Sequence, residues 1–278
     1  MDQDKKIAII VPITRAWALH KLFYNLEQLI CEPKNVSLFM YIDTNNPEVK
    51  RECREYAKTS KFSQVITKIS NNGPTYEVRI AKRRDRIVEC HQVLQKLLWN
   101  MGFDYIFGVE DDTLFGSDTL QKLLEPMSIP DVGYVEGVQV GRWGVKMIGA
   151  WLVDDVENPK RIKTIEPLEV NGVKQRNVHH LENIDAGGFY CFVTRADLYL
   201  SHKFEWHDDC FGPDVLFGIG MRKKGFKCLI DWRVNCGHDV KTDVLWPSDG
   251  KIEVAEYNKV NGEWKRQDRV SEISKQHI

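Results

Sequence analysis

The first 115 residues alternate between short apolar runs and amphipathic helical patterns. Apolar runs of strand length, rich in Ile, Val, Phe and Tyr, cover residues 6–14, 36–43, 63–70 and 103–109. Between them, apolar side chains recur on one helical face in residues 17–30, 46–58 and 84–102. Strands and helices in strict alternation are typical of a mostly parallel, doubly wound sheet. This alternation predicts an α/β fold.

Local end signals support the predicted helices. Asn46 is a favourable N-cap residue, and Pro47 suits the first helical position, where its missing N–H needs no partner. Gly102 follows the longest helical pattern and is typical of a residue that ends a helix.

In the second half of the chain, successive strand patterns replace the alternation of strands and helices. Residues 131–144 and 145–172 read as strands, and the dipeptides Asn158-Pro159 and Asn171-Gly172 are turn signals. The pattern predicts a β-hairpin excursion from the main sheet.

Further along, a loop, a strand and a short helix are predicted in residues 183–200. A helix begins near Pro213 and ends at Gly225, before another strand. The tail from about Trp246 is polar, and we expect it to wrap the surface or to be mobile.

An acidic cluster ends the fourth predicted strand. The polar residues that follow the first, second and fourth strands are Thr14, Arg15, Asp43, Glu110, Asp111 and Asp112. Because ligands of open parallel sheets bind outside the carboxyl ends of the strands, we expect these residues to share one crevice. Adjacent carboxylates repel one another, and a hard cation such as Mg²⁺ or Mn²⁺, holding a diphosphate, would relieve that repulsion. The alternative is a solvated acidic loop after an edge strand.

In their order along the chain, these features resemble the GT-A glycosyltransferases. The segment "VPIT", a strand ending in Asp43, a basic helix entry and "VEDDT" follow one another as in that family, with Glu110-Asp111-Asp112 in the place of its DxD motif. Further along, "DAGGFYCFVTRADLY" looks like the family's Gly-rich acceptor-side segment, and "FGPDVLFGIGMRKKGFK" resembles the catalytic-base segment of the inverting, family-2-like branch. The resemblance covers about residues 7 to 240 and implies a Rossmann-like sheet flanked by helices.

The resemblance implies metal and nucleotide contacts for the residues at the strand ends. Asp112 matches the family's most consistent metal ligand, and His238, in "GHD", is similar to the late His that often completes the metal shell. Glu110 or Asp111 would contact the metal through water or bind the ribose. Asp43 matches the carboxylate that accepts the N–H of uracil, which favours a UDP-sugar. Guanine also offers an N–H, so a GDP-sugar stays open.

Other polar residues would contact the rest of the donor. Thr14 and Arg15 would flank the base and the ribose. In "RIAKRRDR", five basic residues stand at or before a helix start, where backbone N–H groups already favour anions. We expect Lys82 and Arg86 to reach the diphosphate or the sugar, and the other basic residues to form a solvated face.

Asp214 is the candidate base of an inverting transfer, in which a carboxylate removes the proton of the acceptor hydroxyl. An Asp in the first turn of a helix also suits the helix dipole without any catalytic role. The family's usual acidic pair is replaced here by Gly212-Pro213-Asp214, and Asp208 and Asp209 are nearby substitutes. Without a correctly placed base, a retaining transfer becomes the better hypothesis.

Several His and Trp residues of the second half could contact the sugar or the acceptor. His179-His180 precede the Gly-Gly segment, where a surface loop is the simpler interpretation. Tryptophan rings can stack on sugars, but more often they fill a core. The tryptophans concerned are Trp143, Trp151, Trp206 and Trp232.

Composition limits the partners. The formal net charge of −1 gives no global electrostatic reason to bind nucleic acid or an anionic membrane. No apolar run has the length of a membrane span and the first residues carry no signal-peptide core, so we expect a soluble, cytoplasmic protein. The 7 cysteines include no CxxC pair, as in a reducing compartment. A zinc site from Cys228, Cys236 and His238 would have no standard spacing.

The sequence therefore predicts a single GT-A domain over residues 1–278, with a nucleotide-sugar-binding half in 1–115, an acceptor-side half in 116–245 and a tail in 246–278. We expect a metal-dependent transfer of a hexose from a nucleoside diphosphate sugar, preferably a UDP-sugar, to an acceptor hydroxyl with inversion. The alternatives are a retaining transferase, including one that acts on a modified nucleobase in DNA, a sugar-nucleotide nucleotidyltransferase, and an inactive sugar-binding protein of the same fold. The sequence specifies neither the acceptor (glycan, protein, small molecule or modified nucleobase) nor the oligomeric state.

Overall fold

The computed structural model describes most of the chain. The described ranges are residues 5–70, 80–140, 148–153, 155–157, 162–164, 180–206, 212–248, 251–260 and 263–269, with the backbone alone at 80–83, 162–164 and from 248 onward. The predicted turns at Asn158-Pro159 and Asn171-Gly172 lie outside these ranges. The helices are α1 (Leu19–Gln28), α2 (Pro47–Thr59), α3 (Ile80–Leu98), α4 (Thr119–Leu124), α6 (Ala196–Ser201) and α7 (Pro213–Lys223).

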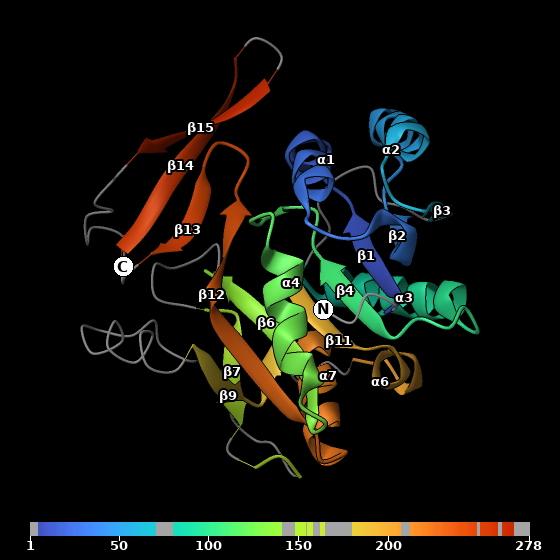
Figure 1. The fold of residues 1–278 in the computed structure, drawn as a ribbon, viewed down its shortest axis with the longest axis vertical. Coiled ribbons are helices and arrows are strands. Elements are labelled where there is room, and N and C mark those ends of the chain that lie inside the picture. Colours follow the sequence, from blue (N-terminus) through green and yellow to red (C-terminus); the bar gives the residue numbers. More distant parts are fainter. Residues whose placement is uncertain are drawn as a thin grey trace.

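The strands build a central sheet and a smaller one (Figure 1). In chain order the strands are β1 (Ile7–Ile13), β2 (Val36–Ile42), β3 (Gln64–Ile69), β4 (Tyr105–Val109), β5 (Thr113–Leu114), β6 (Val132–Gln139), β7 (Ala150–Val153), β8 (Ile162–Thr164), β9 (Leu181–Ile184), β10 (Ala186–Gly187), β11 (Cys191–Arg195), β12 (Lys227–Asp239), β13 (Val244–Ser248), β14 (Lys251–Val260) and β15 (Glu263–Arg269). The central sheet runs in the order β15-β14-β13-β12-β6-β11-β4-β1-β2-β3.

The half of the central sheet formed by β1 to β4 is parallel. The strand pairs β1–β2, β2–β3 and β1–β4 are all parallel, whereas β11 runs antiparallel between β4 and β6. Chain order reverses between β1 and β4, because the chain returns to the centre of the sheet after building its edge. Such a reversal opens a crevice at the carboxyl ends of the strands. The residues that follow β1, β2 and β4 therefore occupy the position at which α/β sheets bind ligands.

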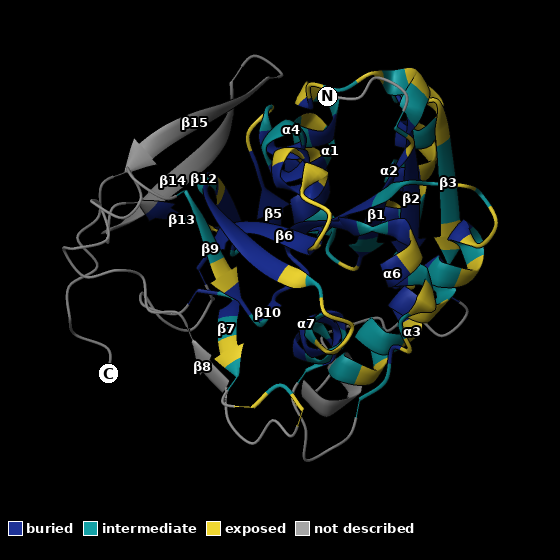
Figure 2. Ribbon diagram, turned by 60° about the horizontal axis from the view of Figure 1, so that its bottom comes forward, coloured by how far each residue is buried: buried dark blue, intermediate teal, exposed yellow. Residues whose placement is uncertain are grey.

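Helices cover both faces of the central sheet, and each face has its own apolar core (Figure 2). On one face, buried side chains of α1, α2 and α4 pack on the sheet; Leu22, Val49 and Leu123 are examples, each 0% exposed. On the other face the helices are α3, α6 and α7, with Leu94 and Phe217 buried completely. The predicted fold class is confirmed: the chain has a GT-A, Rossmann-like α/β fold.

The predicted start of α2 and the predicted end of α7 agree with the structure. The Asn46 side chain accepts a hydrogen bond from the Glu48 N–H at 2.9 Å, as an N-cap does, and α2 begins at Pro47. Gly225, directly after the C-cap of α7, has a φ of 84°, the left-handed conformation in which glycine is favoured after a helix. The end predicted at Gly102 is wrong: α3 ends at Leu98, and the left-handed residue nearest its end is Asn100, with a φ of 63°.

The hairpin excursion is also present. Strands β7 and β8 pair in antiparallel fashion, and β10 joins β7 to form a separate 3-stranded sheet. Several strands were not predicted from the sequence. These are β5, β9 and the strands β14 and β15 at the edge of the central sheet (Figure 1). The last two lie in the segment for which only a polar tail was expected.

Two further features concern the environment of the chain. Among the helices of the described ranges, none combines the length and the apolar character that crossing a bilayer requires. The cysteines that the structure describes as free thiols are Cys31, Cys53, Cys90, Cys191, Cys228 and Cys236. Cys210 lies outside the described residues.

A buried histidine makes the stability of this fold sensitive to acid. His91 is 2% exposed, its Nδ1 lies 2.8 Å from the Tyr199 hydroxyl, and its ring packs against both Phe189 and Phe204. Burial lowers the pKa of His91 from 6.5 to about 3. The unfolded chain therefore binds a proton that the folded chain excludes as the pH falls from 6.5 toward 3. Each pH unit in that window should cost about 1.4 kcal/mol of unfolding free energy.

The test replaces His91 and compares slopes between pH 6.5 and 5. In His91→Gln, we expect the change of unfolding free energy with pH to be smaller by the contribution of about one proton. Urea unfolding at several pH values measures this change. His20, whose side chain is 53% exposed, provides the control His20→Gln, which should keep the wild-type slope. Equal slopes in the His91 variant and the wild type would contradict a neutral, buried His91.

Candidate functional site

Asp111 joins the ends of β1 and β4. Its Oδ2 accepts hydrogen bonds from the Thr14 N–H at 2.6 Å, the Thr14 hydroxyl at 3.2 Å and the Arg15 N–H at 2.8 Å, and its Oδ1 accepts one from the Arg15 guanidinium. The carboxylate is 1% exposed. The structure thus brings Thr14, Arg15 and Asp111 together as predicted, with Asp111 directed at the chain after β1. Direct contacts of Thr14 and Arg15 with a nucleotide stay predictions.

Arg15 supplies a counter-charge for the acidic cluster. Its guanidinium contacts Asp111 and lies 3.3 Å from Oδ1 of Asp112. Burial lowers the pKa of Arg15, but the charges of Asp111, Asp112 and Glu110 outweigh burial and raise that pKa overall. One cation within the chain therefore compensates part of the cluster. The case for a metal ion then depends on Asp112 and its remaining neighbours rather than on the number of carboxylates.

Asp112 and His238 face one another through atoms that both carry lone pairs. His238 Nδ1 lies 2.9 Å from the Val140 carbonyl oxygen, and a carbonyl can only accept. In neutral His238, Nδ1 therefore holds the proton and Nε2 holds the lone pair. That Nε2 lies 3.3 Å from Oδ2 of Asp112. Two acceptor atoms at this distance, with side chains 9% and 1% exposed, require a proton or a cation between them.

The pairing of β5 with β12 brings these two residues together. Thr113 of β5 stands opposite His238 of β12, and the Asp239 N–H donates to the Asp112 carbonyl oxygen at 2.8 Å. Lys21 of α1 forms a buried ion pair with Asp239 at 2.8 Å, which ties the end of β12 to the other side of the site. Neither β5 nor Lys21 was predicted, since a two-residue strand and a single Lys in a helix leave no periodic signal.

The donor set of this pair fits a divalent cation. Adjacent ligands of an octahedral divalent cation, each at about 2.1 Å, lie about 3 Å apart, close to the 3.3 Å between Asp112 Oδ2 and His238 Nε2. The imidazole favours a transition-metal ion over Mg²⁺, which takes oxygen ligands. Within the described residues, no three His, Cys, Asp or Glu side chains form a group that could hold a metal. Cys228, Cys236 and His238 therefore do not form the zinc site considered from the sequence. An ion at Asp112 and His238 would therefore take its other ligands from substrate oxygens and water, as Mg²⁺ commonly does.

Asp43 and Arg86 form a second charged pair at the same edge of the sheet. The Arg86 guanidinium donates to both oxygens of Asp43. Its Nε donates to Oδ2 at 2.6 Å, and one of its terminal nitrogens donates to Oδ1. The Asp43 N–H donates to the Ile13 carbonyl at 2.8 Å, so the ends of β1 and β2 stay in register. Arg86 was expected at the diphosphate or the sugar, and the structure directs it to Asp43. A carboxylate has about four acceptor sites, so a bidentate Arg does not exhaust Asp43.

Asp214 lies in the first turn of α7 and is half-buried. Burial raises the pKa of Asp214, whereas nearby backbone N–H groups and the charge of Arg84 lower it. Arg84, from α3, also lies over the indole ring of Trp206, 5.5 Å from its centroid. Asp214, Arg84 and Trp206 therefore gather where α3 and α7 begin. Arg84 was not among the residues predicted to contact the donor, because helical periodicity alone does not show which of the neighbouring arginines faces inward.

A glycine-containing segment, residues 186–190, links the acidic cluster to α7. The Glu110 N–H donates to the Tyr190 carbonyl oxygen at 3.0 Å. At the other end, Ala186 packs so closely on Gly218 of α7 that a Cβ added to Gly218 would lie 2.5 Å from the Ala186 Cα. The two acidic groups predicted from the sequence, Glu110 to Asp112 and Asp214, are thus connected through this segment.

Several predicted residues lie elsewhere or outside the described structure. Trp232 is 6% exposed and its Nε1 donates to Glu182 at 3.0 Å, a packed position. His180 and Trp151 are half-buried beside β9 and β7. The residues whose side chains lie outside the description are Lys82, Trp143, His179, Asp208 and Asp209.

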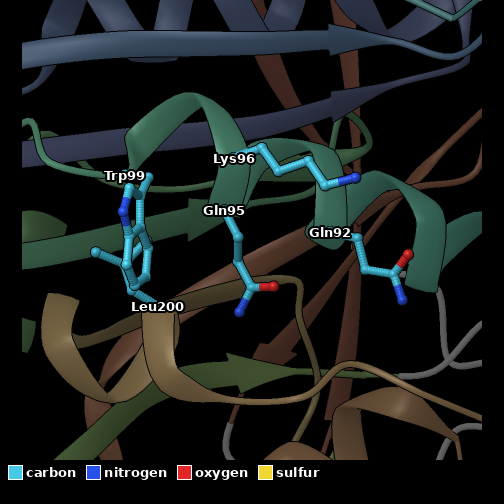
Figure 3. Close-up of a pocket in the computed structure, with 5 residues that line it drawn as sticks. All are labelled: Gln92, Gln95, Lys96, Trp99 and Leu200. Carbon is cyan, nitrogen blue, oxygen red and sulfur yellow. The ribbon is translucent and has the colours of Figure 1, made fainter.

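A surface hollow on the same face as α3 is separate from this site (Figure 3). It is lined by Gln92, Gln95, Lys96 and Trp99 of the α3 region and by Leu200 of α6. These residues belong to the end of α3 that leads into the start of β4, whereas the acidic cluster follows the end of β4. The amides of Gln92 and Gln95 donate to the carbonyls of α6 and the loop after it, a structural role.

Solved structures share this fold at low sequence identity. A structure of GalNAc-T7 with UDP, GalNAc and Mn²⁺ superposes with a TM-score of 0.58 at 13% identity, over 86% of this chain and 44% of that one. The mannosyltransferase PcManGT from Pyrobaculum calidifontis, in complex with GDP-Man and Mn²⁺, gives 0.53 at 11% identity, over 81% and 56%. TarS from S. aureus gives 0.51 at 9% identity, over 81% and 57%.

These comparisons establish the fold. The chain spans about half the length of each of the three proteins. No protein-family profile matches the sequence, and no curated protein matches it either.

Proposed function

We propose that this protein is a metal-dependent glycosyltransferase that moves a hexose from a nucleoside diphosphate sugar to an acceptor hydroxyl. The observation that carries the proposal is the buried Asp112–His238 pair, whose Oδ2 and Nε2 atoms lie 3.3 Å apart at the ligand edge of a GT-A sheet. Two proteins of similar fold are described with Mn²⁺ and a sugar nucleotide or its parts, which supports the same chemistry here.

Each charged group at the sheet edge has a role in this reaction. Asp112 and His238 would hold the cation, which supplies positive charge to the diphosphate leaving group. Asp43, held in place by Arg86, accepts the ring N–H of the nucleobase. Arg15 neutralises Asp111 and so lowers the negative charge that an incoming diphosphate meets.

Asp214 would act on the acceptor side. It accepts the proton of the acceptor hydroxyl while that oxygen forms a bond to the anomeric carbon. The bond from the anomeric carbon to the diphosphate breaks, and the nucleoside diphosphate leaves with the electron pair. Attack opposite the leaving group inverts the anomeric carbon. A retaining transfer remains the alternative, and the products distinguish the two.

The nucleobase is the next open choice. Asp43 suits both uracil and guanine, because each offers a ring N–H, and the two neighbours described with nucleotides carry UDP and GDP-Man. We expect a UDP-sugar to be preferred. The test is a panel of UDP- and GDP-sugars with Mn²⁺, in which release of the free sugar is measured without any acceptor. Failure of every donor to hydrolyse or bind would contradict the proposal.

The same panel separates the other functions. A nucleotidyltransferase would form a sugar nucleotide from a sugar phosphate and a nucleoside triphosphate, and would want a Gly-rich first loop, whereas "VPITRAW" contains no glycine. An inactive sugar-binding protein would bind a donor without hydrolysing it. A modified nucleobase in DNA is one possible acceptor, and the net charge of −1 gives it no general electrostatic support.

A further inference from the structure

A carboxyl group is buried in the middle of β6. Glu136 is 0% exposed, and it interrupts the apolar run "VGYVEGVQV". Its Oε2 lies 2.9 Å from the Tyr134 hydroxyl, and its Oε1 has no hydrogen-bond partner. The same Tyr134 hydroxyl lies 2.8 Å from the carbonyl oxygen of Gly188. A hydroxyl has one proton, so Tyr134 can donate to only one of these two oxygens at a time.

The protonation of Glu136 decides how this chain of groups is connected. If the carboxyl is neutral, Oε2 donates to the Tyr134 oxygen, and Tyr134 donates to the Gly188 carbonyl. Both contacts are then hydrogen bonds. If Glu136 is ionised, its charge draws the Tyr134 proton, and the Gly188 carbonyl loses its donor. Only the neutral form uses both observed distances as hydrogen bonds.

The surroundings of Glu136 favour the neutral form. Burial raises the pKa of Glu136 well above 4.5. Hydrogen bonding to the Tyr134 hydroxyl and to the Gly188 backbone lowers that pKa, and the negative charge of Asp214 raises it, so burial outweighs the contacts that favour the ionised form. The titratable groups of the described structure that interact with it, from β6, β11, β12, α7 and the segment 186–190, are Tyr134, Tyr190, Cys191, Cys228, Cys236 and Asp214. None of these groups carries a positive charge. An ionised Glu136 would therefore be a buried anion without a counter-charge.

Glu136 also sets the position of the segment 186–190. A Cβ added to Gly187 would lie 1.9 Å from Glu136 Oε2, so the carboxyl group packs directly on the Gly187 backbone. The next residue, Gly188, accepts from Tyr134 and donates its N–H to the Gly149 carbonyl at 2.7 Å. This segment contacts the acidic cluster through Tyr190 and α7 through Ala186.

We propose that Glu136 is a positioning residue that works as a neutral carboxylic acid, donating through Tyr134 to the Gly188 carbonyl and so fixing the segment between Glu110 and Asp214. The catalytic part of this inference rests on the proposed function. The structural part does not. Ionisation of Glu136 releases Gly188 and loosens the segment, which links the geometry of the two acidic groups to pH.

The first experiment tests the protonation and needs no substrate. The unfolded chain releases the Glu136 proton near pH 4.5, while the folded chain keeps it to higher pH, so the wild type loses stability as the pH rises through that window. E136Q cannot ionise. Its folding equilibrium constant, divided by that of the wild type, should rise about tenfold per pH unit above pH 5. E55Q, at a position whose side chain is 63% exposed, should show a constant ratio. A constant ratio for E136Q overturns the inference.

The second experiment tests positioning, with donor hydrolysis as the readout. Y134F removes the bridging hydroxyl, and we expect kcat to fall about tenfold with the KM for the donor unchanged, since the loss of one well-placed hydrogen bond is of that size. The wild-type kcat should also fall as Glu136 ionises with rising pH, and this fall should be absent in E136Q. A wild-type kcat in Y134F overturns positioning. If the wild type hydrolyses no donor, the proposed function fails, and the folding comparison still decides the state of Glu136.

Discussion

Asp112→Asn should lower Mn²⁺-dependent hydrolysis of the sugar donor by about 10³-fold, the effect of losing roughly 4 kcal/mol of charge stabilisation. The amide keeps the size of the carboxylate and removes the negative charge that would hold the cation. Because the ion is expected to take few ligands from the protein, loss of one cannot be made up by a third side chain. Binding of the nucleotide, measured by calorimetry with and without Mn²⁺, should lose its metal dependence in the same variant.

The matched control is Asp118→Asn. Asp118 is close in sequence, its side chain is 47% exposed, and its ion pair with Lys122 is of the surface type that contributes little. Its hydrolysis rate should stay within about twofold of the wild type. Thermal unfolding of both variants separates loss of the ion from loss of the fold. Full turnover by Asp112→Asn, or nucleotide binding that never needed a metal, would contradict the proposed function.

Side-chain contacts alter the charge balance of the acidic cluster. From the sequence, we expected a divalent cation to compensate the acidic cluster, with a solvated acidic loop as the alternative. Arg15 follows β1 and turns back to Asp111, so the chain itself supplies part of that charge. A pattern of strands and caps predicts which residues follow which strand. It does not predict that two of them neutralise one another, because that depends on rotamers and on backbone approach.

The first half of the fold was predictable for a physical reason. Parallel strands buried on both faces appear as continuous apolar runs, and their crossover helices bury one stripe, so both leave a clear periodic signal. The order of the runs then fixes the sheet edge at which Thr14, Asp43 and Asp112 meet. The N-cap Asn46 and the glycine after α7 were also readable from the sequence, because helix caps act through contacts within a few residues.

The second half was harder to predict because its strands depend on distant partners. Strand β5 has two residues and exists through its pairing with β12. Strands β14 and β15 are polar. Strand β14 pairs with β13, and β15 pairs with β14 at the edge of the sheet, where little apolar surface is needed. Glu136 did leave a signal, a carboxylate inside an apolar run, but only the structure shows Tyr134 and Gly187 beside it.

Asp214→Asn should lower the rate of transfer by about 10²- to 10⁴-fold, the usual contribution of a general base, and should leave donor binding unchanged. The amide cannot accept the acceptor's proton, and it keeps its place at the start of α7. Water takes the acceptor's role in donor hydrolysis, so the same loss should appear there. NMR of the released sugar, recorded before the anomers equilibrate, then reports inversion or retention. Retention, or a rate near that of the wild type, would remove Asp214 from the role of base.

The pH profile gives an independent test of the same residue. A base must be ionised, so the rate of an enzyme that uses Asp214 falls as the pH drops through the pKa of that carboxyl. Burial raises this pKa and the charge of Arg84 lowers it. Arg84→Gln should therefore move the acid limb of the profile to higher pH, while Asp214→Asn should abolish the limb. If the acid limb of Arg84→Gln lies at the same pH as that of the wild type, another carboxyl group accepts the proton. The contact between α3 and α7 would then serve binding of the sugar rather than its transfer.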